Sequence, residues 1–173
     1  MKYSATSRQG RQQQIYNSDG ARLVVGVVPI LATSKQVVLV SSRTRPNEWI
    51  LPKGGWESDE SQGSVGTETG YVNVLQKPFI EESALREAYE ESGIKGTLTC
   101  NIGTFPHTKH FPDSDIPTCE FTFFEMEVTT LCEAWPEQGE RQRGLFNFEE
   151  ASKLLSHKPL MLQALLKCSE GLQ

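Results

Sequence analysis

The stretch REAYEESGI, residues 86–94, carries the clearest structural pattern in the chain. It continues a run of good helix formers, ESALREAYEES at residues 82–92, and Gly93 follows where a helix would end. Pro78 stands where a helix can begin, and Glu81 suits the positive first turn of a helix. We therefore predict a helix over residues 79–92.

Three glutamates of this helix fall on one edge. Glu87 and Glu91 are four residues apart and Glu90 is three from Glu87, so the carboxylates converge. Like charges at this spacing repel, and Arg86 alone compensates too little of the charge. A hard cation with oxygen ligands, Mg²⁺ or alternatively Mn²⁺, would explain the cluster. The triplet is therefore a candidate metal site.

A solvated acidic helix face is the alternative interpretation of the triplet. Apolar Ala88 and Tyr89 fall where the helix would bury itself, so the acidic edge belongs to a helix packed by its other side. Upstream, the glycine loop Lys53-Gly54-Gly55 lets the backbone approach closely, and a carbonyl there could complete the coordination of a metal. These neighbours favour the metal site.

The segments around the helix predict a mixture of strands and helices. ARLVVGVVPIL, residues 21–31, and QVVLVSS, residues 36–42, are rich in β-branched residues, and WILP at 49–52 leads into the glycine loop. Further strands are expected at residues 96–105, 119–128 and near 145–148, and further helices at residues 148–157 and 159–169. The fold class is α+β. We expect a mobile tail over residues 1–19 and one domain over residues 20–170, with an inserted loop at about 61–78.

Composition limits the classes of function. A chain of 173 residues is long enough for one domain with a sizeable core, and its net charge of −5 disfavours a general nucleic-acid binder. No apolar run approaches the length of a membrane span, and the first twenty residues hold no block like that of a signal peptide. Four scattered cysteines without a C-x-x-C pair suggest neither a zinc site nor a disulfide framework. We expect an intracellular monomer, in the cytoplasm or nucleus.

The stretch REAYEESGI resembles the second half of the Nudix box, whose pattern is R-E-U-x-E-E-x-G-U with U aliphatic. Gly54 and Glu60, with five residues between them, match the first half. This resemblance implies an α/β/α sandwich around a mixed β-sheet and a metal-dependent hydrolase of phosphoanhydride bonds. Glu60 and Arg86 are separated by twenty-five residues instead of the seven of the family, so we expect the eighteen additional residues to loop out. An unspliced stretch in a gene model is the alternative origin of this insert.

Further segments resemble one subgroup of the family, the diphosphoinositol polyphosphate phosphohydrolases. They are VLVSSRTRPNEWILPKGG at 38–55, GTFPHTKH at 103–110, GERQRGLFNFEEA at 139–151 and SHKPL at 156–160. The resemblance implies hydrolysis of diphosphoinositol polyphosphates (inositol pyrophosphates) and also of diadenosine polyphosphates. The partner would therefore be a polyanionic small molecule.

The same resemblance assigns roles to individual residues. Glu87, Glu91 and the carbonyl of Lys53 match metal ligands, and Glu90 matches the general base, with Arg86 as the second catalytic residue. Substrate contacts are expected at Arg22, Ser42, Arg43, Thr44, Arg45, Arg143 and Lys158. A polyphosphate needs a local cationic wall, to which His107, Lys109, His110 and Arg141 would also contribute.

Two competing functions remain open at the level of sequence. A Nudix enzyme acting on ADP-ribose, NADH or an mRNA cap would need a stacking aromatic residue, for which Trp56 and Trp135 are candidates. A catalytically inactive binding module with the same fold, disabled by the insert, is the second. Three clustered carboxylates argue against that module, because binding alone has no evident need for them.

Overall fold

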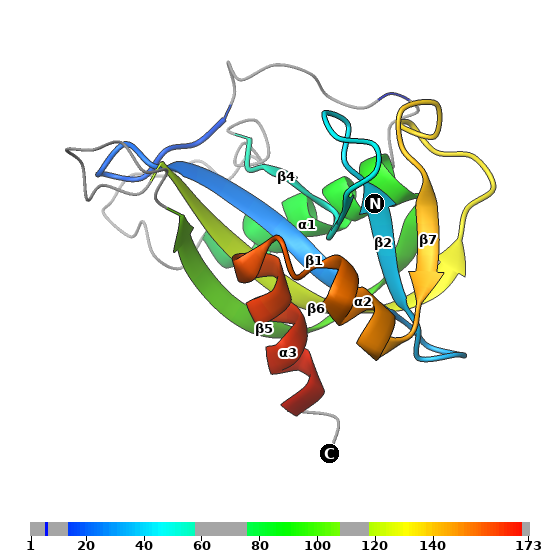
Figure 1. Ribbon diagram of the computed structural model, residues 1–173. Coiled ribbons are helices and arrows are strands. Elements are labelled where there is room, and N and C mark those ends of the chain that lie inside the picture. The colour runs from blue at the N-terminus through cyan, green and yellow to red at the C-terminus, as the bar shows by residue number, and fades with distance from the viewer. Residues whose placement is uncertain (1–5, 7–13, 58–75, 108–117, 171–173) are drawn as a thin grey trace.

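The computed structural model describes residues 6, 14–57, 76–107 and 118–170, and its core is a mixed β-sheet between helices (Figure 1). The first half of this chain forms β1 (Arg22–Leu31), β2 (Val37–Ser41), β3 (Trp49–Ile50), β4 (Lys53–Gly55) and α1 (Gln76–Ser92). The second half forms β5 (Ile94–His107), β6 (Cys119–Leu131), β7 (Arg143–Phe146), α2 (Phe148–Leu154) and α3 (Pro159–Glu170).

Strand β1 lies at the centre of the sheet. It pairs in parallel with β6, from Arg22 opposite Cys119 to Leu31 opposite Val128, and β5 continues the sheet antiparallel to β6. On its other side β1 pairs antiparallel with β2 and with the short glycine strand β4. Strand β2 in turn pairs with β3 and β7. The glycine loop is therefore attached directly to the central strand.

Helices cover both faces of the sheet, with α1 behind it and α2 and α3 in front in Figure 1. Val25 and Val27 of β1 pack with Ala84 of α1, whereas the alternate residue Val28 belongs to the cluster that contains Leu165 of α3. Two apolar layers thus hold a three-layer sandwich together. The predicted α+β class and the α/β/α sandwich are confirmed.

The predicted elements are all present, with shifted ends. Helix α1 begins at Gln76, earlier than the expected residue 79, so Pro78 lies inside the first turn, where a backbone donor is not needed. Strands β5 and β6 extend beyond the predicted ranges, and α2 ends at Leu154. The start of α2 is a capping box in which Asn147 and Glu150 exchange hydrogen bonds of 2.9 and 3.0 Å.

Two expected segments fall wholly or partly outside the described residues. Of the insert expected at 61–78, residues 61–75 lie outside them, as do most residues of the expected tail. Ile15 and Tyr16, at the end of that tail, join the sheet region: the Ile15 N–H donates to the Trp56 carbonyl at 2.9 Å, and Tyr16 pairs with Arg22. Within the described chain, no helix is both long and apolar enough to cross a membrane.

Candidate active site

Helix α1 turns its three glutamates toward the glycine strand β4 and the loop before β7. The residues are almost fully buried, with exposed fractions of 9% for Glu87, 3% for Glu90 and 5% for Glu91. Ala84 and Ala88 of the same helix have no exposed surface and pack on the sheet, which brings the acidic edge close to β4. This triplet is therefore not a solvated helix face.

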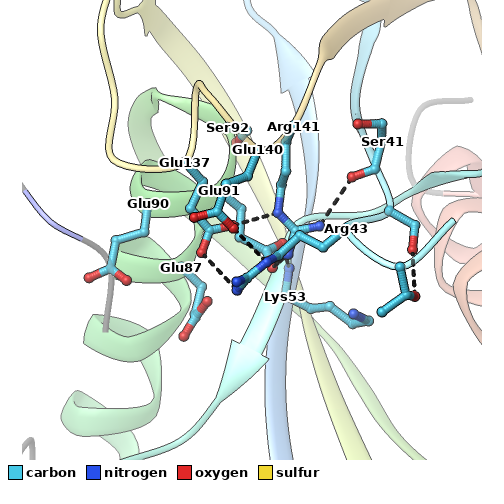
Figure 2. Close-up of polar contacts among 12 residues, drawn as sticks. Ser41, Arg43, Lys53, Glu87, Glu90, Glu91, Ser92, Glu137, Glu140 and Arg141 are labelled. Atoms are coloured by element: carbon cyan, nitrogen blue, oxygen red, sulfur yellow. Dashed lines mark hydrogen bonds and ion pairs between the residues drawn. The ribbon is translucent and has the colours of Figure 1, made fainter. Parts of the chain in front are cut away.

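Glu91 lies at the meeting point of three elements (Figure 2). One carboxylate oxygen accepts a hydrogen bond from the Lys53 N–H of β4 at 2.9 Å, and the other accepts from the Arg141 guanidinium. Arg141 also donates to the Glu137 carboxylate at 2.5 Å and to the Ser41 carbonyl at 3.1 Å. Arg141, only 9% exposed, thus connects α1, β2 and the segment before β7.

Glu87 lies directly against Gly54. A Cβ atom at position 54 would overlap the Glu87 carboxylate, so a residue with a side chain cannot stand there without displacing it. Arg86 donates to the carboxylates of Glu87 at 2.8 Å and Glu90 at 3.4 Å, and to the Gly55 carbonyl at 3.2 Å. The arginine of the motif therefore fixes the glycine strand to the acidic edge.

Burial makes these carboxylates difficult to ionise. Loss of hydration raises the pKa of Glu87 to about 8; Arg86 opposes this rise, and the charges of Glu91 and Glu90 add to it. Burial also raises the pKa of Glu91, against the opposing effects of Lys53 and Arg141. The acidic edge therefore lacks enough positive charge for its carboxylates to ionise freely.

The donor set fits a hard divalent cation. Glu87 and Glu91 supply buried carboxylate oxygens beside the main chain at Lys53, and Gly54 leaves open the space that a side chain would fill. Among the described residues, no group of three His, Cys, Asp or Glu side chains is arranged so that it could coordinate one metal ion. Arg86 and Arg141 contact the carboxylates instead, so cation binding requires these contacts to rearrange.

A cavity of about 550 Å³ adjoins the acidic edge at Lys53. Its polar lining includes Ser42, Thr44, Lys53, His107, His157 and Lys158. Its apolar lining consists of Ile50, Phe121, Phe123, Pro159, Leu160 and Met161. Lys53 belongs to both regions, since it lines the cavity and its N–H donates to Glu91.

Of the expected substrate residues, the structure places Ser42, Thr44 and Lys158 on the cavity wall. Arg43 points to other partners, with ion pairs of 2.7 Å to Glu140 and 3.7 Å to Glu137 (Figure 2). Arg45 makes a 3.1 Å ion pair with Glu48 and is largely exposed. The two arginines therefore flank cavity residues without lining the cavity.

Arg143 contacts the C-terminal end of α1, which directly follows Glu91. Its Nη1 donates to the carbonyls of Ser92, Gly93 and Cys132 at 3.0, 3.2 and 3.1 Å, and its guanidinium lies 4.4 Å from the Trp135 ring centroid. These contacts place a cation where the helix carbonyls end, which stabilises that terminus. The structure does not bring Arg143 together with the cavity residues.

Arg22 begins β1, in register with Cys119, which is in turn in register with His107. It therefore lies at the same end of the sheet as the cavity residue His107 but does not line the cavity. Lys109, His110 and Glu60 lie outside the described residues.

Several residues near the cavity escaped sequence reasoning. The Glu48 carboxylate lies 2.9 Å from the Lys158 ammonium nitrogen and 3.3 Å from Nε2 of His157, and it also pairs with Arg45. Phe121, rather than Trp56 or Trp135, is an aromatic residue that lines the cavity. No local pattern could reveal these residues, because their partners come from distant segments of the chain.

Comparison with known proteins gives sequence relatives across most of the chain, although no protein-family model matches it. The chain is 35% identical to "Nudix hydrolase 21, chloroplastic" of Arabidopsis thaliana over 158 residues, which cover 87% of this chain and 68% of the relative. It is 32% identical to human "Diphosphoinositol polyphosphate phosphohydrolase 3-alpha" over 139 residues, covering 79% and 70%.

The fold is also shared with solved structures. An Ap4A hydrolase of C. elegans, solved as a binary complex, matches with a TM-score of 0.59, covering 86% of this chain and 97% of its own. Its sequence identity is 17%, so the similarity establishes the fold alone. Together with the sequence relatives, the motif of α1 and the sandwich around it show that the chain belongs to the Nudix hydrolase family.

Proposed function

We propose that the chain hydrolyses phosphoanhydride bonds in diphosphoinositol polyphosphates and diadenosine polyphosphates, with Mg²⁺, or Mn²⁺ in its place, as the metal. One observation carries the proposal: the buried glutamates of α1 connect through Lys53 to a cavity whose wall holds Ser42, Lys158 and His107. This connection through Lys53 supports a hydrolytic site next to a binding site for polyanions. Similarity to a human diphosphoinositol polyphosphate phosphohydrolase supports the choice of substrate.

The catalytic roles follow from the contacts of the acidic edge. Glu87, Glu91 and the main chain at Lys53 would hold the metal, which lowers the pKa of a water molecule and neutralises phosphate charge when bound. Glu90 accepts the proton of the attacking water. Arg86 orients Glu87 and Glu90 through its hydrogen bonds to both carboxylates.

The cavity wall binds the rest of the substrate. Lys53 and Lys158 neutralise phosphate oxygens, and the hydroxyls of Ser42 and Thr44 donate hydrogen bonds to them. Charge that develops on the leaving phosphate is spread over these donors, which is a main source of rate in phosphoryl transfer. The residues proposed to bind the substrate are thus those that line the cavity.

The apolar side of the same cavity favours a nucleoside-containing substrate as second candidate. Phe121 and Phe123 are stacked with ring centroids 6.1 Å apart, and Met161 lies on the same wall. An aromatic base can pack on such a surface, whereas a phosphorylated inositol ring offers it little apolar area. Diadenosine polyphosphates and ADP-ribose satisfy this requirement, and an Ap4A hydrolase shares the fold.

Chromatographic analysis of products tests the proposed function, because hydrolysis releases inorganic phosphate from diphosphoinositol pentakisphosphate, two nucleotides from diadenosine hexaphosphate, and AMP with ribose 5-phosphate from ADP-ribose. Diphosphoinositol pentakisphosphate, diadenosine hexaphosphate and ADP-ribose are incubated with the wild type and with Glu91→Gln, with Mg²⁺ or with chelator. We expect metal-dependent hydrolysis, whose rate falls by a factor on the order of 100 to 10,000 in the variant. Glu149→Gln, an exposed glutamate paired with Lys153, is the control and keeps wild-type rates.

Three outcomes would contradict the proposal. Near wild-type turnover by Glu91→Gln would remove the assigned role of that carboxylate. Activity on ADP-ribose alone would transfer the assignment to another Nudix specificity. Metal binding without hydrolysis of any of the three compounds would identify an inactive module. The expected monomeric state and the cytoplasmic or nuclear location remain predictions, to be tested by gel filtration and cell fractionation.

A further inference from the structure

Glu48 connects the two walls of the cavity through ion pairs. It follows the turn that carries Ser42 and Thr44, and its carboxylate binds Lys158 at 2.9 Å and His157 at 3.3 Å, both at the start of α3. Arg45 reaches the same carboxylate at 3.1 Å from the turn itself. Lys158, and after it Arg45, lower the pKa of Glu48, so its carboxyl group is ionised at neutral pH.

The backbone on both sides is held independently of this carboxylate. In the turn, the Ser42 N–H donates to the Glu48 carbonyl and the Glu48 N–H donates to the Arg45 carbonyl, each at 2.8 Å. At the start of α3, the Lys158 N–H donates to the Leu155 carbonyl at 2.8 Å. Removal of the Glu48 charge should therefore change the electrostatics of the cavity mouth more than its shape.

The charge of Glu48 acts against a polyanionic ligand in two ways. It neutralises Lys158, which lines the cavity, and a substrate phosphate must displace it to bind that ammonium group directly. It also repels every negative charge within about one Debye length, roughly 8 Å at physiological salt. The repulsion grows with the number of phosphates, whereas a partly exposed ion pair contributes little to holding Lys158 in place.

We propose that Glu48 is a specificity-determining residue that weakens the binding of the most highly charged polyphosphates relative to less charged ones. The inference rests on the proposed function only in taking the cavity as the substrate site. Glu48 thereby shifts preference toward substrates that combine few phosphates with an apolar group, which the Phe121 side of the cavity can accept.

Calorimetry tests this inference without any need for turnover. The probes are inositol hexakisphosphate, which is densely charged, and ADP, which carries fewer charges. We expect Glu48→Gln to bind inositol hexakisphosphate about threefold to tenfold more tightly than the wild type, and ADP within about twofold. The gain should disappear at about 1 M salt, where the Debye length is about 3 Å.

Two further variants separate charge from shape. Glu48→Asp keeps the charge and should keep wild-type affinity, and Glu149→Gln removes an equal charge from an ion pair on α2, away from the cavity lining. The inference would be overturned if Glu48→Gln bound inositol hexakisphosphate no more tightly than the wild type, or did not bind it detectably. An equal gain for ADP would also overturn it. Absence of hydrolysis by the wild type would refute the proposed function and leave this measurement valid.

Discussion

Gly54 lies directly against the Glu87 carboxylate of the acidic edge. Because a Cβ at position 54 would overlap the Glu87 carboxylate, we expect Gly54→Ala to displace that carboxylate and lower kcat at least about a hundredfold. The chain should stay folded, which a thermal melt would show. Gly139→Ala is the matched control, since an added Cβ there meets no atom within 4 Å. Unchanged kcat in Gly54→Ala would exclude Glu87 from catalysis.

Glu87 should make the metal-free protein less stable as pH rises. Its pKa is about 8 in the folded chain and 4.5 without burial, so the folded state binds the proton more tightly than the unfolded state. The stabilisation from the protonated carboxyl is complete below pH 4.5 and is lost progressively up to about pH 8. Urea unfolding in chelator between pH 5 and 8 measures this slope. Glu87→Gln should flatten it, and an equal slope in both proteins would contradict the assignment.

The sequence predicted the acidic residues of the site better than their partners. The spacing of Glu87, Glu90 and Glu91 was enough to predict that they share one edge of the helix, and all three are buried there, because helical periodicity is local. The contact of Arg141 with Glu91 depends on how the segment before β7 crosses the sheet. Such a contact is set by tertiary packing, and no pattern in neighbouring residues encodes it.

At the scale of elements, Arg143 fastens the end of helix α1. We expect Arg143→Gln to lower the free energy of unfolding by about 1–3 kcal/mol, because three carbonyls lose a charged donor and Trp135 loses its cation. Urea denaturation checks this change. Arg45→Gln, at an exposed arginine, should stay within about 0.5 kcal/mol of the wild type.

The same variant distinguishes a structural from a substrate-binding role for Arg143. If Arg143 acts only by stabilising the end of the helix, the KM of Arg143→Gln for a polyphosphate should differ from that of the wild type by less than about twofold, measured at a temperature where the variant is folded. A large rise in KM with unchanged stability would restore the role expected from the sequence resemblance. Arg143 shows that a motif can preserve the position of an arginine without revealing where its side chain points.

Element boundaries were predicted less well than the elements themselves. Alternation in the β5 and β6 segments indicated two antiparallel strands, but the pair contains irregularities near Gly96, Cys100 and Gly103. Each irregularity shifts which residues face a given layer, so the period of two is broken. The local pattern therefore predicted both strands to be shorter than they are.

For the whole molecule, Mg²⁺ should raise thermal stability, since a ligand that binds the folded chain alone stabilises it. At a concentration about a hundredfold above its Kd the expected gain is about 2.7 kcal/mol. Thermal melts with MgCl₂, compared with KCl at equal ionic strength, measure the gain. It should vanish in Glu91→Gln, and a shift of equal size in that variant would place the cation elsewhere.

The arrangement of strands was the part of the fold least accessible to reasoning from residues. The β-branched run of residues 21–31 predicted a strand, and β1 is present there with most of its residues buried on both faces. Its parallel pairing with β6 joins residues as distant as Arg22 and Cys119, and sequence periodicity contains no information about partners. The pattern of elements predicted an α+β sandwich, and the family resemblance added the α/β/α order of its layers around a mixed sheet.

The parallel pairing of β1 with β6 also sets the order in which the molecule can be completed. During synthesis, β1 and α1 leave the ribosome before β6, so the central strand lacks a long neighbour until most of the chain has been translated. Joining such distant segments is slow because loop closure precedes the contacts that reward it. The nascent chain thus carries the glutamates proposed for catalysis well before the sheet around them is complete.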